Sequence, residues 1–463
     1  MGVDKMKVDI HEKLSRTIKM AIDTGEAATI EDAEQIFKSY QLAVEVGTDI
    51  TLSATLQVLL LTIVNTARRC FLGGVHVQTT DAKLLVSWNG CETLHQAIID
   101  LRGNITEQVP CCIPRVIIGD VNNPKGIGPF AVRATFDGWR GGVIPFDEGR
   151  LEEKREFTPA GVLAGALAVS EAFQHVRGGN PIAGRRDVGL SLWNPASNAS
   201  WLDASNSGPL IEKLPSKLWL IGLGHLGQAM LWTLGFLPYA RPDEVFLVLN
   251  DFDVLSEAND STSPLTFAPV LAERKTRAMA RWCEARGFKT MVTERLFSNN
   301  INVAFDEPTV AFCGVDNALA RSVLEDVGFD RIIEAGLGKG ELEYLSFQIH
   351  TFPGPQKAKQ RWKEYVGPTI QGEMKLAYKQ LSVEGMDECG IVTLAGRSVG
   401  ASFVGTMVAS LAVAELLKLV LGAPVSGLID GTLRSLDRRK MIGNHEWSKP
   451  FNPGVTDAVT IQK

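Results

Sequence analysis

Three glycines at fixed spacing mark the part of the chain best suited to chemistry. Gly222, Gly224 and Gly227 follow the apolar run 218–221 in the order Gly-x-Gly-x-x-Gly. Such a turn lets a phosphate approach the backbone, and the helix that follows directs free N–H groups and a positive dipole end at an anion. The spacing predicts a nucleotide-binding loop. A packing turn that binds nothing is the alternative.

Two acidic residues follow the next apolar run. Residues 244–249 lead into Asp251 and Asp253. A carboxylate at the end of the second strand can accept hydrogen bonds from ribose hydroxyls. The order strand, glycine turn, helix, strand and acid is typical of a βαβ unit, which serves ATP and NAD alike.

The elements around this unit must position it. Apolar strand-like runs alternate with helical patterns, which predicts an α/β fold of two Rossmann-like domains with mostly parallel sheets, the C-terminal one carrying the nucleotide site. A turn-rich connection at 177–216 predicts domains 1–205 and 206–463. We expect a mobile insertion around 354–398, and helices throughout residues 8–46.

An internal echo links the two halves. Helices expected at 159–176 and 400–421 are both rich in small residues, and both carry Ala-Val-x-Glu, ending at Glu171 and Glu415. The echo suggests that the first half is a degenerate copy of the second; two packed helices that merely look alike are the alternative. A degenerate first half could serve as a built-in partner, and a homodimer is the other arrangement left open.

Composition narrows the class of protein. The 463 residues are 45% hydrophobic and 22% charged with net charge −6, and no basic tract stands out, which disfavours a nucleic-acid partner. We find no apolar run long enough to predict a membrane span. Seven scattered cysteines, an odd number, favour a reducing cytoplasm over a disulfide framework.

Further polar residues continue the pattern of the glycine unit. The run 218–321 contains the acids named above, followed by Asn259, Lys275, the pair Asp316-Asn317 and Arg321. In these residues it resembles the adenylation domain of ubiquitin-activating enzymes, and equally the bacterial enzymes that activate sulfur-carrier proteins for thiamine and molybdopterin synthesis. Residues 1–205 match only in general character, which would make the chain an atypical bacterial member with an extra N-terminal domain.

The resemblance implies ATP and Mg²⁺ as ligands. It would place Asp251 on the ATP ribose, Asn259 near the phosphates, Lys275 on a phosphate and Asp316 on the magnesium, beside Asn317. The substrate would be the C-terminal carboxylate of a small ubiquitin-like or sulfur-carrier protein, with a conjugating enzyme as a further partner. Adenylation joins a carboxylate oxygen to the α-phosphorus and expels pyrophosphate, so positioning and charge neutralisation dominate.

One position departs from the family. Thr262 stands where an arginine is usual, so a cation would have to come from elsewhere; the candidates are Arg16, Arg68, Arg69 and Arg274. The departure keeps open a catalytically decayed scaffold or partner subunit. An NAD-dependent oxidoreductase is the other rival, although Lys275 and Asp316 have no special role in a dehydrogenase.

A cysteine could continue the reaction after adenylation. Cys389 lies in Asp387-Glu-Cys-Gly, the region where family members that form a thioester carry a cysteine, and a thiolate attacks an acyl-adenylate readily. An ordinary buried cysteine is the alternative. We expect Cys283 and Cys313, in a helix and a strand, to be core residues.

The thioester hypothesis predicts a loss of one covalent product. Cys389→Ala should abolish the reducing-agent-sensitive conjugate between this chain and its carrier protein, because the attacking sulfur is gone, while adenylation continues. Non-reducing gels and pyrophosphate exchange measure the two steps, with Cys283→Ala as control. A conjugate that persists in Cys389→Ala would assign the acceptor to another cysteine.

Overall fold

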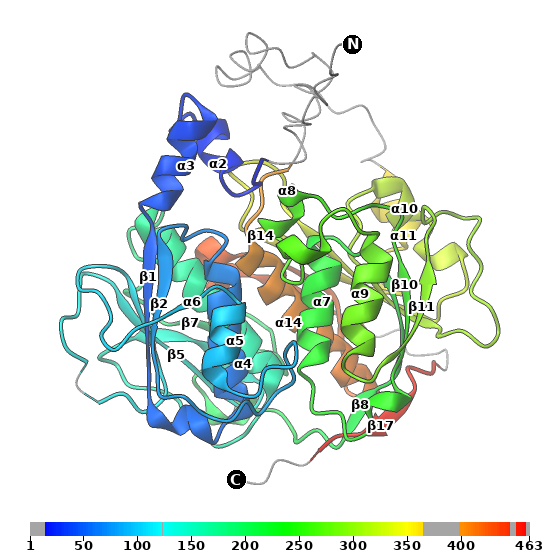
Figure 1. Ribbon diagram of the computed structural model, residues 1–463. Coiled ribbons are helices and arrows are strands. Elements are labelled where there is room, and N and C mark those ends of the chain that lie inside the picture. Colours follow the sequence, from blue (N-terminus) through cyan, green and yellow to red (C-terminus); the bar gives the residue numbers. More distant parts are fainter. Residues whose placement is uncertain (1–13, 123, 364–397, 445–450, 460–463) are drawn as a thin grey trace, which may run out of the picture.

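Two sheets with the same strand order organise the chain (Figure 1). The computed structural model describes residues 14–122, 124–363, 398–444 and 451–459. The first sheet has the order β3-β2-β1-β4-β5-β6-β7, and the second has the order β11-β10-β9-β12-β13-β14-β15-β16. Strand by strand, β1 to β7 therefore take the places that β9 to β15 take in the second sheet.

The strands of the first sheet lie between residues 41 and 191: β1 (Gln41–Val46), β2 (Gly74–Gln78), β3 (Asn104–Ile105), β4 (Arg115–Ile118), β5 (Ala131–Asp137), β6 (Arg140–Pro145) and β7 (Val188–Ser191). Those of the second lie between 217 and 443: β9 (Lys217–Ile221), β10 (Phe246–Asn250), β11 (Lys289–Thr293), β12 (Val310–Cys313), β13 (Arg331–Leu337), β14 (Ser346–Phe352), β15 (Ser426–Thr432) and β16 (Lys440–Gly443). A small third sheet pairs β8 (Lys213–Pro215) with β17 (Val455–Asp457).

Both sheets are mostly parallel. The register pairs Val44 of β1 with Val116 of β4, and Leu220 of β9 with Phe312 of β12, both in parallel. Only the strands from β6 and from β14 onward run antiparallel to their neighbours. The predicted α/β class with mostly parallel sheets is confirmed.

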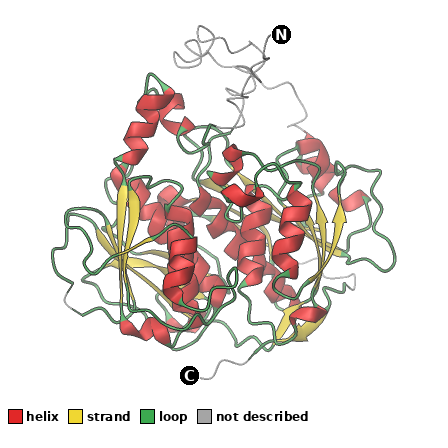
Figure 2. Ribbon diagram, in the orientation of Figure 1, coloured by secondary structure: helices red, strands yellow, loops and turns green. Residues whose placement is uncertain are grey.

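Four long helices fill the space between the sheets (Figure 2). They are α4 (Ala54–Ala67), α6 (Thr158–Val176), α7 (His225–Gly235) and α14 (Ser402–Val420). Every residue of α4 is buried, and so is almost all of α14. A helix that is apolar on all sides is a core helix, so this layer forms the shared core of both halves.

Small residues allow these helices to pack closely. A Cβ added at Gly161 or Gly165 of α6 would lie 2.6 or 2.7 Å from a backbone oxygen of α4. Between the halves, the rings of Phe173 and Phe403 are 5.5 Å apart, and Trp232 Nε1 donates to Thr62 Oγ1 at 3.1 Å.

Within the described residues, α14 is the one helix long and apolar enough to cross a membrane, and 94% of its apolar window is buried inside the fold.

The two echoing glutamates have equivalent places. Glu171 Oε2 of α6 accepts a hydrogen bond from the N–H of Gly184 (2.9 Å), before β7. Glu415 Oε2 of α14 accepts one from the N–H of Ser426 (2.6 Å), at the start of β15. Each buried carboxylate thus fastens its long helix to the strand that follows.

The prediction of helices throughout residues 8–46 is wrong for the described part, residues 14–46. The described part contains α2 (Lys19–Asp23) and α3 (Ile30–Lys38), but its end is β1, a central strand of the first sheet. Leu42, Ala43 and Val44 are fully buried. A parallel strand covered on both faces is a continuous apolar run, which periodicity cannot distinguish from a buried helix.

Shorter helices join the strands: α5 (Leu94–Asp100), α8 (Glu257–Asp260), α9 (Lys275–Glu284), α10 (Ala318–Ser322) and α11 (Ala358–Arg361). The predicted insertion at 354–398 begins with α11. Residues 364–397, which include Cys389, lie outside the described residues.

Candidate functional site

The three glycines have three different surroundings. Gly222 follows β9 with φ +83°, and its N–H donates to Asn250 O at 2.8 Å. A Cβ at Gly227 would overlap the carbonyl oxygen of Gly222, whereas one at Gly224 would meet nothing within 4 Å. Gly222 therefore makes the turn, Gly227 allows the helix to approach it, and Gly224 leaves backbone open to a ligand.

A cavity of about 290 Å³ opens above this loop, at the carboxyl ends of the central strands of the second sheet. Eight residues singled out from the sequence line it: Gly222, Gly224, Asp251, Asp253, Asn259, Lys275, Asp316 and Asn317. Gly227 lies behind the loop. The cavity thus brings together almost the whole predicted nucleotide set, which a parallel sheet does by ending its strands at one edge.

Asp251 ties the end of β10 to the glycine loop. Its Oδ2 accepts a hydrogen bond from the N–H of Leu223 (2.7 Å), and its Oδ1 accepts one from the N–H of Asp253 (2.9 Å). The ammonium of Lys275, in the first turn of α9, lies 2.7 Å from Asp253 Oδ2 and 3.7 Å from Asp251 Oδ1. Lys275 is therefore held at the cavity by carboxylates.

The Asp316-Asn317 pair starts α10. Asn317 Oδ1 accepts hydrogen bonds from the N–H groups of Leu319 (2.8 Å) and Ala320 (3.2 Å), a side-chain cap. Arg321 Nε donates to Val315 O at 2.7 Å and lies 3.2 Å from Oε1 of the fully buried Glu334. This support fixes the backbone on both sides of Asp316.

Thr262 is buried and lines the cavity, and its Oγ1 has no hydrogen-bond partner among the described residues. Of the four arginines considered as replacements for its missing charge, only Arg16 lines the cavity. Arg274 donates to the backbone oxygen of Phe252, which lines the cavity, but Arg274 is not itself a lining residue.

Arg68 and Arg69 instead hold the loop that carries Thr262. Arg68 Nη2 lies 2.6 Å from Asp260 Oδ1, and Arg69 Nη2 donates to Ser263 O at 3.0 Å. Burial raises the pKa of the Asp260 carboxyl, but the guanidiniums of Arg69 and Arg68 lower it by more, so its pKa lies below the ordinary value. The end of α4, in the first half, thus fixes a wall of the cavity in the second.

Arg16 is brought in by a strap at residues 14–18. The N–H of Arg16 donates to Ser261 Oγ at 3.0 Å. Thr17 Oγ1, which is buried, lies within hydrogen-bonding distance of Gly400 O (3.0 Å) and Ser261 O (3.2 Å). The strap is therefore fixed to α8 on one side and to the start of α14 on the other.

His225 packs against α14. Burial lowers its pKa to about 4, and its Nε2 lies 3.3 Å from Ser402 O. A Cβ at Gly405 would overlap the imidazole ring. The histidine of the glycine loop is therefore neutral near pH 7 and adds no positive charge to the cavity.

Sequence reasoning missed the turn after β13. Leu337, Gly338 and Lys339 line the cavity, and Lys339 has no ion pair within the described part of the chain. β13 runs parallel to β12, and the rule that ligands bind at the carboxyl ends of parallel strands points to this turn.

A second cavity, of about 1060 Å³, adjoins the first. The two share Asp316, Asn317 and the 337–339 turn as lining residues. The far wall of the larger cavity comes from β14, β15 and the turn after them, and includes Gln348, Asp430 and Arg438. Gln348 Nε2 donates to Asp430 Oδ1 at 2.9 Å.

The described cysteines separate into core and surface. Cys283 and Cys313 are fully buried, and burial raises the pKa of each thiol to about 12. Cys111 and Cys112 are exposed. In the described ranges, no three His, Cys, Asp or Glu side chains gather into a metal site.

Comparison with known proteins identifies the family. A family model for the BilD N-terminal domain matches residues 41–192, and one for the BilD C-terminal domain matches residues 214–423. The bacterial E1-like protein BilD of Collimonas sp. (strain OK412) is 40% identical over 454 residues, 97% of each chain. The chain belongs to the family of bacterial E1-like BilD proteins.

The similarity to solved structures is weaker, in both sequence identity and TM-score. PaaA is 15% identical with a TM-score of 0.33, over 50% of this chain and 64% of that one, which is less than two thirds of PaaA. E. coli MccB with MccA-N7isoASN is 13% identical with a TM-score of 0.32, over the same shares of the two chains. E. coli MccB alone is 10% identical with a TM-score of 0.32, over 68% of this chain and 91% of that one.

The glycine loop gives a matched pair of variants. Gly227→Ala should lower the free energy of unfolding by about 1–3 kcal/mol, because the new Cβ displaces the backbone of Gly222. Gly224→Ala should leave unfolding unchanged, because its Cβ enters open space. Denaturant unfolding compares the two. Equal stability of both variants would contradict this geometry.

Proposed function

We propose that this chain adenylates the C-terminal carboxylate of a small ubiquitin-like or sulfur-carrier protein with ATP and Mg²⁺. The observation that carries the proposal is the gathering of the glycine loop, Asp251, Lys275 and Asp316 around one cavity that adjoins a larger one. Membership in an E1-like family supports it.

The smaller cavity suits a nucleotide. The open backbone at Gly224 and the start of α7 suit an anion. Asp251 retains acceptor capacity for ribose hydroxyls, because a carboxylate offers about four lone-pair sites and two are used within the protein. A phosphate would compete with Asp253 for the ammonium of Lys275, since both are anions within reach of one cation.

The magnesium assignment rests on a single carboxylate. Mg²⁺ commonly binds one or two carboxylates together with substrate phosphates, so Asp316 at the cavity wall fits that donor set. When bound, the ion would offset phosphate charge. The chain's own part is to hold Asp316 still, through the Asn317 cap and the Arg321 contact with Val315.

The larger cavity suits the tail of a protein substrate. A tail lying between Gln348 and the 337–339 turn would bring its terminal carboxylate to the shared wall at Asp316. There a carboxylate oxygen would bond to the α-phosphorus, and the bond to the leaving pyrophosphate oxygen would break with its electron pair. We propose further that the thiolate of Cys389 then attacks the acyl carbon, so that a C–S bond forms while the C–O bond to AMP breaks and AMP leaves.

Pyrophosphate exchange tests the reaction itself. With ATP, Mg²⁺ and a candidate carrier protein, labelled pyrophosphate should enter ATP, and Asp316→Asn should reduce the rate about 100-fold, because one charge in the site is lost. An unchanged exchange rate in Asp316→Asn would contradict the assignment of Asp316 as the magnesium ligand. Absence of exchange together with tight NAD binding would support an oxidoreductase, and absence of both would support a decayed scaffold.

Arg16 is our proposed replacement for the cation missing at Thr262. Arg16→Gln should lower the exchange rate about 100-fold with little change in stability, because the strap is held by the backbone and Thr17. Arg16→Lys should restore part of the rate. Lys38→Gln, on the exposed face of α3, is the control. Full exchange in Arg16→Gln would place the cation elsewhere.

A further inference from the structure

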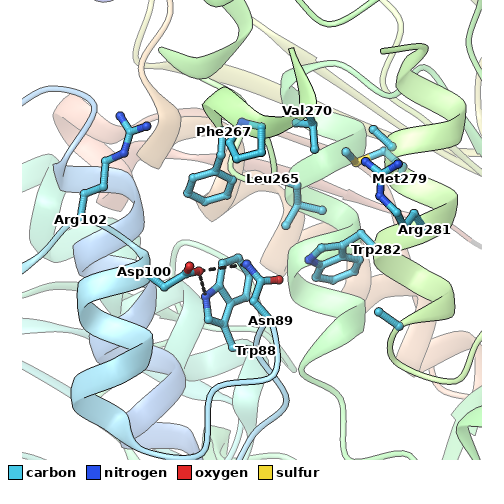
Figure 3. A pocket seen from close by; sticks show the side chains of 13 residues that line it. Trp88, Asn89, Asp100, Arg102, Leu265, Phe267, Val270, Met279, Arg281 and Trp282 are labelled. Carbon is cyan, nitrogen blue, oxygen red and sulfur yellow. Dashed lines mark hydrogen bonds between the residues drawn. The ribbon is translucent and has the colours of Figure 1, made fainter. Parts of the chain in front are cut away.

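A third cavity, of about 390 Å³, lies where the two halves meet (Figure 3). The first half contributes Trp88, Asn89, Asp100 and Arg102, and the second contributes the segment 265–270 and one face of α9. It shares no lining residue with either cavity described above. Its volume is near the lower end of small-molecule sites, about 300–1,000 Å³, which suits a single small ligand better than a peptide strand.

The walls are aromatic and aliphatic. Trp88 and Trp282 stand on opposite sides in Figure 3, with Phe267 and Leu265 above them. The ring of Trp88 is fixed: its Nε1 donates to Asp100 Oδ2 at 2.7 Å, and its ring meets Phe267 edge-on at 6.0 Å. A planar apolar group fits such a setting.

Arginines already lie against the rings. The guanidinium carbon of Arg286 lies 3.5 Å from the centroid of the Trp282 ring and 5.7 Å from that of Trp88, and the guanidinium carbon of Arg68 lies 4.6 Å from the centroid of Phe267. Aromatic faces attract cations, and these faces are taken. The cavity therefore does not suit a cationic ligand, as an open aromatic cage would.

The charge around the cavity is mainly positive. Arg102 is exposed on its rim, with no ion pair or hydrogen bond within the described residues, while Arg281 on the other side is 2.8 Å from Glu273. Arg286 is mostly buried and bonds only the carbonyl oxygens of Trp282 and Ser87. Burial lowers its pKa to about 10, so it stays charged near neutral pH.

Asp100 is the one acid among the lining residues. Its Oδ2 already accepts hydrogen bonds from Trp88 (2.7 Å) and from Asn89 Nδ2 (2.9 Å), as the dashed lines in Figure 3 show. Arg281 is paired with Glu273, but Arg102 and Arg286 have no acidic partner among the described residues, so the surroundings favour an anion.

We propose that this cavity binds a small aromatic acid, with the planar ring beside Phe267 and Trp282 and the anionic group toward Arg102. The proposal is independent of the adenylation reaction. The wall segment 265–270 is nevertheless the connection between Thr262 and Lys275, so a ligand here contacts the chain that carries two residues of the nucleotide cavity.

Two fluorescent probes test the ring and the charge separately. The full-length chain is titrated with 8-anilino-1-naphthalenesulfonate and with N-phenyl-1-naphthylamine, which has the same rings without the sulfonate. We expect one sulfonate probe per chain, bound about fivefold more tightly than the neutral one. Excess Mg·ATP should not displace it; displacement would assign the probe to the nucleotide cavity and overturn the proposal.

Variants locate the site. Arg102→Gln should weaken the sulfonate probe about fivefold and leave the neutral probe unchanged. Ala285→Trp, at an exposed lining position, should fill the cavity and remove both. Arg241→Gln, an exposed arginine paired with Asp243 and Glu244, is the control. Unchanged sulfonate binding in either cavity variant, or an equal loss in Arg241→Gln, would overturn the proposal.

Discussion

Arg68 and Arg69 bind the segment 260–266 and so join the two halves beside the smaller cavity. Both guanidiniums are almost wholly buried, and they meet Asp260 and the carbonyl oxygens of Ser263 and Thr266. Removing one partner of a buried ion pair is costly, because the other charge is left without compensation. Asn259 precedes this segment and Thr262 lies within it, so the first half sets the shape of a cavity whose residues belong mostly to the second.

Local order in the chain was enough to predict which residues gather at the smaller cavity. The glycines, Asp251, Lys275 and Asp316 lie at strand ends, and parallel pairing brings strand ends together whatever the loops do. Three features were beyond such reasoning. The strand β1 has the same apolar pattern as a buried helix, and the approach of Arg16 depends on contacts with Ser261 and Gly400 far along the chain. The role of Arg68 and Arg69, which follow the end of α4, depends on packing between the halves.

The sheets share one strand order, but their strand ends differ. Where the second half has Gly222 and Gly224, the first has the 3-10 helix Thr48–Thr51. Asp49 fills the space there: its Oδ1 accepts from the N–H of Asp120 at 3.0 Å, and its Oδ2 lies 3.0 Å from Arg150 Nη1. Side chains thus occupy the position that the second half leaves open. We propose that the first half is a degenerate copy that kept the shared helical core and lost the ligand.

The strap at residues 14–18 belongs to the same chain as the cavity, and this affects how its contacts depend on protein concentration. Arg16 and the loop it meets belong to one polypeptide, so bringing them together is an intramolecular event with an effective concentration set by the fold. An assembly of separate subunits would lose such a contact on dilution by mass action. In this chain, therefore, the contact of Arg16 with this loop does not depend on the protein concentration, and it forms equally at low and at high abundance.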